Sequence, residues 1–169
     1  NGIPAPLFFV SPGQINFQVP ERTMIGPATI IIRNSFGNVS LARLNLAPVS
    51  PGVFTRLANG KGAPAAVAST DNGQTYALSM SNADGSPVEV QVGHIAVFFG
   101  TGLRFQSGAL SATAAGIALT PAYAGVQGQL VGLDQINLII PETLRGKGET
   151  ELIFLFDGRN ANAIRIKVR

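Results

Sequence analysis

Two stretches of the chain decide its fold, because one is a near copy of the other. Residues 11–21 read SPGQINFQVPE, and residues 132–142 read GLDQINLIIPE. Both carry Gln-Ile-Asn, three further residues and Pro-Glu. The short apolar run before each proline predicts a β-strand, which the proline ends. The repeat therefore predicts that one β unit occurs twice in the chain.

The two copies continue to match after the proline. Three further pairs follow in the same order: Gly26 with Gly148, ATIIIRNSFGN (28–38) with ELIFLFDGRN (151–160), and LARLNL (41–46) with AIRIKV (163–168). Each copy therefore predicts a strand, a proline break, a glycine turn, a strand, a hairpin and a last strand. Since Gln14 and Gln135 are 121 residues apart, the period is too long for a solenoid and fits two tandem β-sandwich modules.

The composition agrees with an all-β fold. Gly and Pro account for 20 and 11 of the 169 residues, and hydrophobic residues for 46%. Short apolar runs rich in Ile, Val and Phe are separated by Asn-Gly or Asp-Gly pairs, which favour tight turns. These pairs begin at Asn59, Asn72, Asp84 and Asp157. The predicted fold class is all-β, with tandem Ig-like β-sandwich modules of which the first is incomplete.

The two copies differ in what precedes them. The 85 residues from Ser50 to Asp134 precede the second Gln-Ile-Asn, whereas only 13 residues precede the first. We therefore expect residues 1–49 to form a partial β-sandwich module with its C-terminal strands only, and residues 50–169 to form a complete Ig-like module. The chain begins at Asn1 without Met, which indicates a processed or truncated start. The missing strands would come from upstream chain or from another molecule.

Candidate catalytic and metal-binding residues are few. His94 is the only histidine and there is no cysteine, which excludes two-His and Cys-based metal sites. We expect His94 to lie in a turn or at a strand edge. Glu21 and Glu142 could form a glycosidase pair, but their equivalence in the repeat places them in separate modules. We predict no catalytic residue, no cofactor and no metal site, and therefore no enzyme.

Three other motifs are better explained by turns than by ligands. TDNG (70–73) and NADGS (82–86) carry calcium-type ligands, but their spacing is not that of a calcium loop, and Asn, Asp and Gly favour turns. GTGLRF (100–105) is a lone Gly-x-Gly without a following helix, which argues against phosphate binding. Asn38-Val39-Ser40 is a formal glycosylation sequence in a predicted turn, and we interpret it as a chance match.

Gln14 and Asn16 share one face of a predicted strand because they are two residues apart. They could form a polar binding strip. Alternatively, their amides could bond to main-chain groups of a neighbouring loop and fix the strand's register. We favour the second interpretation because both copies keep the pair, and we expect Gln135 to bond to main chain inside its own module.

The charge pattern limits the possible partners. Lys and Arg number 12 and Asp and Glu number 9, which gives a net charge of +3 at pH 7 without any basic cluster. Nucleic acid is therefore not an expected partner. No apolar run approaches the roughly 18 residues that a membrane span needs, so we do not expect the chain to span a membrane.

Four segments together resemble a known family. They are NGIPAPLFFVSPGQINFQVP (1–20), PGVFT (51–55), FFGTGLR (98–104) and GLDQINLIIP (132–141). The chain resembles the uncharacterised C-terminal domain that recurs in secreted proteins of Solibacter-like acidobacteria. The resemblance implies a secreted or cell-surface protein in which this region is a non-catalytic Ig-like module, and it implies no assigned activity. It also implies that NGIPAPLFF lies in the middle of a domain, and the sequence departs from the family's more polar pattern at Val88–Val92.

Several predicted strands carry large apolar side chains on both faces. The clearest cases are TIIIR (29–33), HIAVFFG (94–100) and ELIFLFD (151–157). Only 12% of the residues are charged, against about 25% in typical domains. Two-faced strands, low charge and an incomplete module all predict assembly, with outer faces covered by the sister module, a loop or a neighbouring subunit.

We therefore expect a non-catalytic extracellular structural module, a subunit of a secreted or cell-surface fibre or array that is assembled by β-strand complementation. Its partners would be further copies of itself or neighbouring modules, met through strand edges, and PLFFV (6–10) is the candidate donor or edge strand. The alternative is a carbohydrate- or protein-binding accessory module of a larger secreted protein. Carbohydrate binding is disfavoured because the chain has no Trp and only two Tyr, Tyr76 and Tyr123.

Overall fold

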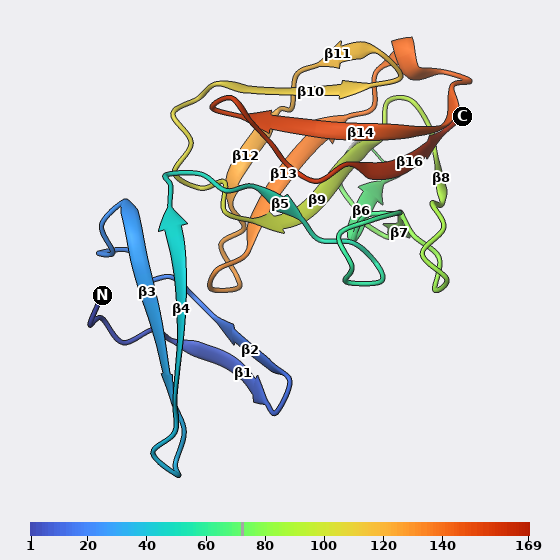
Figure 1. The fold of residues 1–169 in the computed structure, drawn as a ribbon. Helices are drawn as coiled ribbons and strands as arrows, with labels where there is room; N and C mark the ends of the chain where they lie inside the picture. The colour runs from blue at the N-terminus through green and yellow to red at the C-terminus, as the bar shows by residue number, and fades with distance from the viewer. Residues whose placement is uncertain (72) are drawn as a thin grey trace. The chain divides into compact units, whose positions relative to one another are not determined.

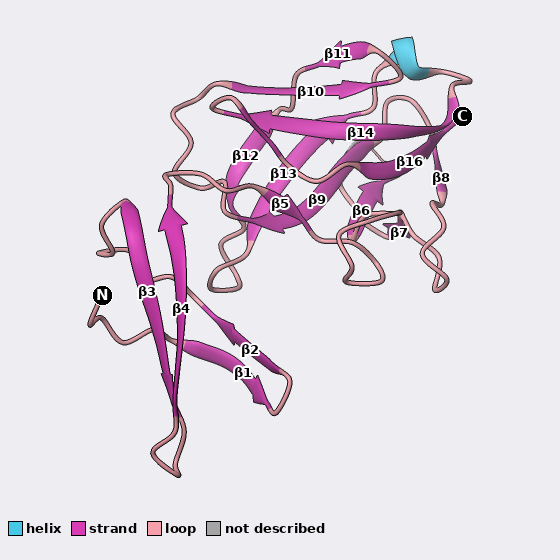
Figure 2. Cartoon of the chain, viewed as in Figure 1, coloured by secondary structure: helices cyan, strands magenta, loops and turns pink. Residues whose placement is uncertain are grey.

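The computed structural model describes residues 1–71 and 73–169, and its regular elements are almost all β-strands (Figures 1 and 2). The chain divides into two compact units, Asn1–Pro48 (unit 1) and Val49–Arg169 (unit 2). This division lies one residue before the predicted boundary between residues 49 and 50. The predicted Asn72-Gly73 turn begins at a residue outside the described part of the chain.

Unit 2 is a β-sandwich of two six-stranded sheets. One sheet has the order β11-β10-β14-β16-β8, with β15 beside β14; its strands are β8 (Glu89–Val90), β10 (Leu110–Ala114), β11 (Ile117–Leu119), β14 (Gly148–Phe156), β15 (Arg159–Asn160) and β16 (Ile164–Val168). The other has the order β12-β13-β9-β6-β7, with β5 beside β9; its strands are β5 (Gly52–Val53), β6 (Ala66–Ser69), β7 (Leu78–Ser79), β9 (Ile95–Thr101), β12 (Tyr123–Val126) and β13 (Asp134–Ile139). A 3₁₀ turn, η1 (Glu142–Leu144), leads from β13 towards β14.

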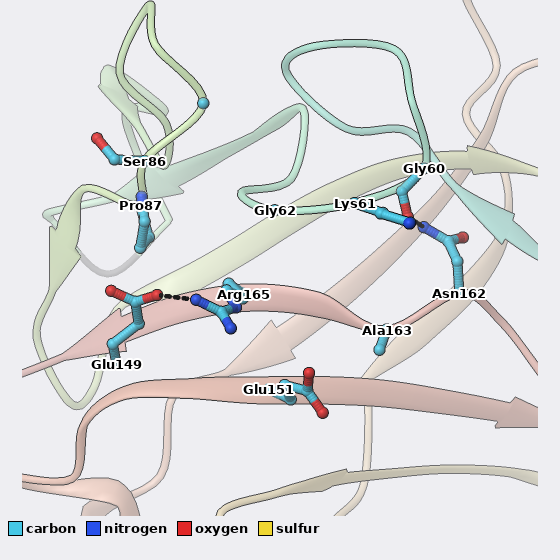
Figure 3. Close-up of a pocket in the computed structure, with 11 residues that line it drawn as sticks. Gly60, Lys61, Gly62, Ser86, Pro87, Glu149, Glu151, Asn162, Ala163 and Arg165 are labelled. Carbon is cyan, nitrogen blue, oxygen red and sulfur yellow. Dashed lines mark hydrogen bonds and ion pairs between the residues drawn. The ribbon is translucent and has the colours of Figure 1, made fainter.

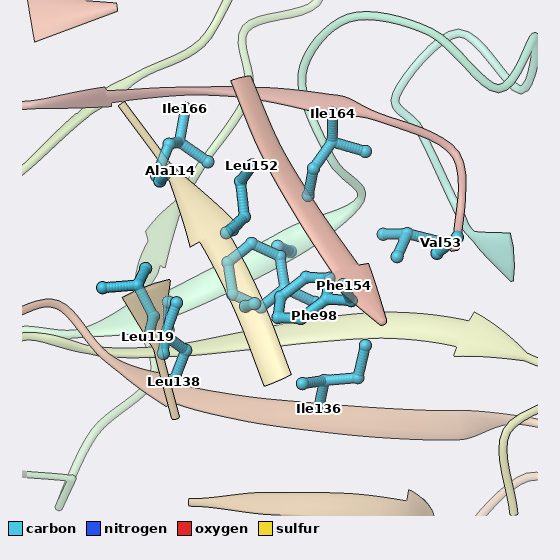
Figure 4. Close-up of a cluster of buried hydrophobic side chains, with 14 of the residues drawn as sticks. Val53, Phe98, Ala114, Leu119, Ile136, Leu138, Leu152, Phe154, Ile164 and Ile166 are labelled. Carbon is cyan, nitrogen blue, oxygen red and sulfur yellow. The ribbon is translucent and has the colours of Figure 1, made fainter. Parts of the chain in front are cut away.

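The core of unit 2 lies between the two sheets (Figure 4). Side chains alternate along each strand, so Leu152, Phe154 and Phe156 of β14 point inward and are fully buried. Phe98 of β9 meets Phe154 from the opposite sheet edge-to-face, with ring centroids 5.2 Å apart. The strand β14 is apolar on its outer face too, as predicted, and Ile153 there is half-buried.

Unit 1 consists of two antiparallel hairpins. The first pairs β1 (Leu7–Ser11) with β2 (Gln14–Phe17), and the second pairs β3 (Gly26–Arg33) with β4 (Val39–Leu46). The N-terminus lies against β3: the Asn1 ammonium donates to the Thr29 carbonyl at 3.0 Å, and the Thr29 N–H donates to Asn1 Oδ1 at 3.1 Å. The segment PLFFV thus contributes to β1, which is already paired with β2 inside its own unit.

The hairpin β3–β4 repeats the pairing of β14 with β16. Gly26 pairs with Leu46 as Gly148 pairs with Val168, and the same offset of 122 residues holds at every further step until Ile30 and Leu152. Because the pairing partners are shifted by the same number of residues, each side chain of β3 has one counterpart on β14. The repeat seen in the sequence is therefore a repeat of strand register.

The hairpin β1–β2 repeats the pairing of β12 with β13 in the same way. Val10 pairs with Ile15, and Ala124 pairs with Ile136. One step along, Phe9 pairs with Asn16 as Tyr123 pairs with Asn137. The repeat thus includes a further strand, β1, whose match with β12 is not visible in the side chains.

The strand β15 pairs with the end of β14 as the first residues of β4 pair with the end of β3. The remaining strands of unit 2 have no counterpart among the strands of unit 1, all of whose residues are described. In unit 2, β13 also pairs with β9, and β14 also pairs with β10. In unit 1, β2 and β3 each pair with a single strand. Ile136 is consequently fully buried, whereas its counterpart Ile15 is only half-buried.

Candidate functional site

The candidate interaction surface is apolar and belongs to unit 1. Six of its residues are the counterparts of core residues of unit 2: Ile15, Phe17, Ile30, Ile32, Ala42 and Leu44 correspond to Ile136, Leu138, Leu152, Phe154, Ile164 and Ile166. We call these six residues the open face. The unit 2 residues are at most 1% exposed, but Phe17 is 37% and Ile32 is 40% exposed.

Unit 1 buries little apolar surface. Among residues 1–48, all of which are described, Ala28 is the only buried hydrophobic residue. More than half of the exposed large hydrophobic side chains of the described residues lie in unit 1, although it is much shorter than unit 2. Phe17 and Ile32 of the open face are among these exposed side chains. Large exposed apolar patches mark interaction sites in soluble proteins, so unit 1 is where such a site is expected.

Two strand edges border the open face. The edge of β2 corresponds to the edge of β13 on which β9 pairs, with Phe98 opposite Ile136. The edge of β3 corresponds to the edge of β14 on which β10 pairs, with Ala114 opposite Leu152. An unpaired edge presents main-chain N–H and C=O groups that can receive another strand. On β3 the N–H and C=O of Thr29 are already bonded to Asn1, so the part of this edge that can receive a strand lies beyond Thr29.

Charged side chains do little to protect these edges. Unit 1 has four of them, Glu21, Arg22, Arg33 and Arg43, and only Arg33, at the last position, lies on β3. The strand β2 (QINF) has none. Solvent-facing edge strands are normally protected by charges, prolines or bulges. The strand β3 carries Pro27, whereas β2 carries neither a charge nor a proline, so the edge of β2 is the less protected of the two.

The Gln-Asn pair makes the same contact in both units. Gln14 Nε2 donates to Asn16 Oδ1 at 2.7 Å, and Gln135 Nε2 donates to Asn137 Oδ1 at 2.7 Å. The expectation that Gln135 bonds to main chain is therefore wrong. Side chains two residues apart on a strand lie side by side on one face, so the two amides are close enough to bond to each other.

The two glutamates after the prolines serve equivalent turns. The Thr23 N–H donates to the Pro20 carbonyl at 2.9 Å, and the Leu144 N–H donates to the Pro141 carbonyl at 3.0 Å. Glu142 accepts hydrogen bonds from Arg145, and these bonds, helped by the positive charge, lower the pKa of Glu142. Glu21 and Glu142 lie in different units, so no carboxylate pair is formed from them within either unit.

The other candidate residues take part in turns. His94 directly precedes β9, and its Nδ1 accepts a hydrogen bond from the Gln91 N–H at 3.4 Å, which confirms the expected turn position. Asp71 accepts a bond from the Thr75 N–H, the main cause of its lowered pKa. Asp84 accepts bonds from the Ser86 hydroxyl and N–H, which lower its pKa.

The sequon and the glycine motif also have structural roles. Asn34 Oδ1 accepts bonds from the Phe36 and Asn38 N–H groups, so Asn38 ends the turn between β3 and β4. In GTGLRF, a Cβ on Gly100 would lie 2.4 Å from a main-chain oxygen of residue 52, and one on Gly102 would lie 2.2 Å from that of residue 50. The glycines therefore permit the close approach of the chain around β5 to β9.

A buried ion pair holds the loop after β9 in place, and no sequence motif predicted it. Asp134 is fully buried and accepts bonds from Arg104 Nε at 2.8 Å and from the Leu103 N–H at 3.1 Å. It directly precedes Gln135, and its place in the first copy is taken by Gly13. The difference between the copies is the only sequence signal that could have indicated this residue.

A hollow of about 750 Å³ lies on unit 2 between two loops and strands β14 and β16 (Figure 3). Its charged lining residues are Lys61, Glu149, Glu151 and Arg165, all of them exposed. Arg165 Nη1 donates to Glu149 Oε1 at 3.0 Å. No group of three His, Asp or Glu residues suited to a metal ion occurs among residues 1–71 and 73–169.

Comparison of the chain with protein-family models, curated proteins and solved structures finds no match. Within the described residues, no helix is both long and apolar enough to cross a membrane.

Proposed function

We propose that this chain is a non-catalytic structural module of a secreted or cell-surface fibre or array, joined to its neighbours by β-strand complementation. The observation that carries the proposal is the open face with its two strand edges. A large apolar side chain gains about 1.5–3 kcal/mol when it is fully buried, so covering this face stabilises an assembly. Main-chain hydrogen bonds along the edges of β2 and β3 would also fix the direction and the register of an incoming strand.

The contacts of unit 2 support a structural role. The side chains of Asp71, Asp84 and Asp157 accept hydrogen bonds from nearby loop groups, as residues that stabilise turns do. Secretion is proposed from the resemblance of the repeated Gln-Ile-Asn segments to a family of secreted proteins.

Size measurement over a dilution series tests assembly. We expect the chain to associate in a concentration-dependent way, because exposure of the open face to water is unfavourable. The variant Phe17→Lys changes the open face and should lower the association constant at least tenfold. The control Phe36→Lys changes a side chain that is 89% exposed in the turn between β3 and β4, and it should leave association unchanged. A monodisperse 17.5 kDa monomer at every concentration contradicts the proposal.

Immunogold electron microscopy of the source cells tests the location. Label on surface fibres or arrays is expected, and label confined to the cytoplasm contradicts the proposed location.

The second candidate function is a ligand-binding accessory module, and the hollow beside β16 is the observation that favours it. Its paired Glu149 and Arg165 offer both charge signs to a polar carbohydrate or peptide. A glycan and peptide array probes this function directly. Binding that is lost in Arg165→Ala supports it, and an array without hits removes it.

A further inference from the structure

We propose that the open face of unit 1 is completed by a polypeptide segment built like residues 49–114, and that a second copy of this chain, which can still associate through exposed side chains such as Phe17, does not supply the strands that pair along β2 and β3. The inference rests on the proposed strand complementation and names the partner. In unit 2 the same strand edges are already paired, that of β13 with β9 and that of β14 with β10.

Unit 2 shows which strand fits beside β2. Its counterpart β13 pairs antiparallel with β9, so that Phe98 lies opposite Ile136 and Ala96 lies opposite Leu138. Since Ile15 and Phe17 occupy these two positions on β2, an incoming strand would place a large apolar residue opposite Ile15 and a small one opposite Phe17. A strand with the pattern of IAVFFG meets this requirement.

Unit 2 also shows which strand fits beside β3. Its counterpart β14 pairs antiparallel with β10, and the turn after β10 brings the Ala115 N–H to Thr150 Oγ1 at 3.1 Å. Phe9 and Tyr123 are equivalent and lie 114 residues apart. At the same offset, Asn1 is the counterpart of Ala115. Asn1 lies against Thr29 of β3, so a strand in this place would end beside Asn1.

The two turns share a conformation that favours glycine. Gly116 follows Ala115 with φ 74°, and Gly2 follows Asn1 with φ 79°. Backbone at positive φ is adopted readily by glycine and rarely by other residues. At this glycine the chain of unit 1 therefore has nearly the same φ as the chain that leaves β10 in unit 2.

The incoming segment would also fill the missing half of the core. In unit 2, Phe98 packs on Phe154 with ring centroids 5.2 Å apart, and the counterpart of Phe154 is Ile32 at 40% exposure. Residues 49–114 contribute many of the buried side chains of unit 2, including Val53, Ala68 and Met80. A segment of the same pattern would therefore cover Ile32 as Phe98 covers Phe154.

The numbers of strands disfavour a second copy as the donor. Each chain holds one segment of the type 49–114, but two sets of strands that can receive it. In unit 2 this segment is already in place, with Ala96 and Phe98 fully buried. If this segment moved to unit 1 of another chain, its side chains would leave the core of their own unit 2. The apolar surface buried in one unit would be exposed in the other, so the exchange would bring no net burial of apolar surface.

A fusion tests the inference. A second copy of residues 49–114 is joined directly to Asn1, because Asn1 takes the place of Ala115. We expect the amides of β2 and β3 to exchange with solvent at least a hundredfold more slowly than in the unmodified chain, approaching those of β13 and β14. The control fusion carries Phe98→Asp and Ala96→Asp in the added copy only, and β2 and β3 should then exchange as fast as in the unmodified chain.

Two results would overturn the inference. One is fast exchange of β2 and β3 in the fusion while β13 and β14 remain protected, which would show that the added segment folds nowhere on unit 1. The other is slow exchange of β2 in a stable dimer of the unmodified chain, which would make a second copy the occupant. Association of the unmodified chain through Phe17, measured separately, decides the proposed function whatever the fusion shows.

Discussion

Asp134 holds the loop after β9 against the start of β13. It is fully buried, and its partner Arg104 is 16% exposed. Removal of one member of a buried ion pair leaves the other charge without compensation. We expect Asp134→Ala to lower the free energy of unfolding of unit 2 by about 3 kcal/mol, measured by urea denaturation. Glu149→Ala breaks an exposed pair with Arg165 and should cost at most about 1 kcal/mol; equal effects of the two variants would contradict the assignment.

Gly102 allows the chain before β5 to pass close to β9. A Cβ at this position would lie 2.2 Å from the main-chain oxygen of Ser50, which cannot move aside as a side chain can, and φ is 77°. Gly116 has a similar φ of 74°, but a Cβ there would meet nothing within 4 Å. We expect Gly116→Ala to cost about 1 kcal/mol of stability and Gly102→Ala at least about twice as much. Thermal unfolding of both variants checks this order, and the reverse order would refute the steric explanation.

Asp157 joins the β14–β15 turn to the loop before β10. Hydrogen bonds from the Ser107 N–H and hydroxyl, both at 2.8 Å, hold the pKa of Asp157 below its ordinary value of 3.8. A lowered folded-state pKa stabilises the fold fully above the ordinary value, and this stabilisation is lost as the pH falls through the lowered pKa. We therefore expect stability to decline below about pH 3.8, and the decline to be smaller in Asp157→Asn. Denaturation midpoints between about pH 2 and 6 test this, and parallel curves for the two proteins would contradict it.

Equivalent positions on β3 and β14 should respond differently to the same kind of truncation. Phe154 on β14 is fully buried, whereas Ile32 on β3 is 40% exposed. We expect Phe154→Ala to cost about 3–5 kcal/mol, as other large-to-small core changes do, and Ile32→Ala to cost less than about 1 kcal/mol in the chain alone. Denaturation of both variants tests the difference. In the fusion with a second segment 49–114, Ile32→Ala should become clearly more destabilising.

The sequence predicted three of the four repeated strands, and the reason lies in their side chains. The strands β2, β3 and β4 carry apolar residues at the same positions as the core residues of β13, β14 and β16, so the two copies can be aligned from their sequences. The strands β1 and β12 read LFFVS and YAGV. Their equivalence is carried by main-chain pairing with β2 and β13, which imposes no residue type, and it could not be predicted from side chains.

The candidate site was predicted in outline but not in its contacts. The short stretch before Gln14 indicated that the first copy has fewer strands, and the exposed positions of Phe17 and Ile32 agree with that. The prediction for Gln135 is wrong because Asn137, on the same face of the strand, offers an amide oxygen 2.7 Å from Gln135 Nε2. The repeat does not predict Asp134, because Gly13 takes its place in the first copy.

The two units should differ in local stability. Unit 2 has a closed core, while Ala28 is the only buried hydrophobic residue among residues 1–48, which are all described. Few buried contacts and exposed main-chain hydrogen bonds permit local opening at low free-energy cost. In dilute protein we expect amides of β2 and β3 to exchange within minutes at neutral pH, and those of β13 and β14 to require hours. Similar protection of both sets in a monomer would contradict the division into a closed and an open unit.

Because β2 and β13 have matching registers, both can pair with β9, and they compete for it while the chain folds. Phe98 of β9 is 38 residues from Ile136 and 83 residues from Ile15, and the entropy of loop closure favours the nearer partner by only about 0.7 kcal/mol. Strand exchange between similar neighbours is a characteristic error of repeat proteins. A fraction of molecules should therefore first dock β9 on the wrong repeat and reach the native state through slow, unimolecular rearrangement.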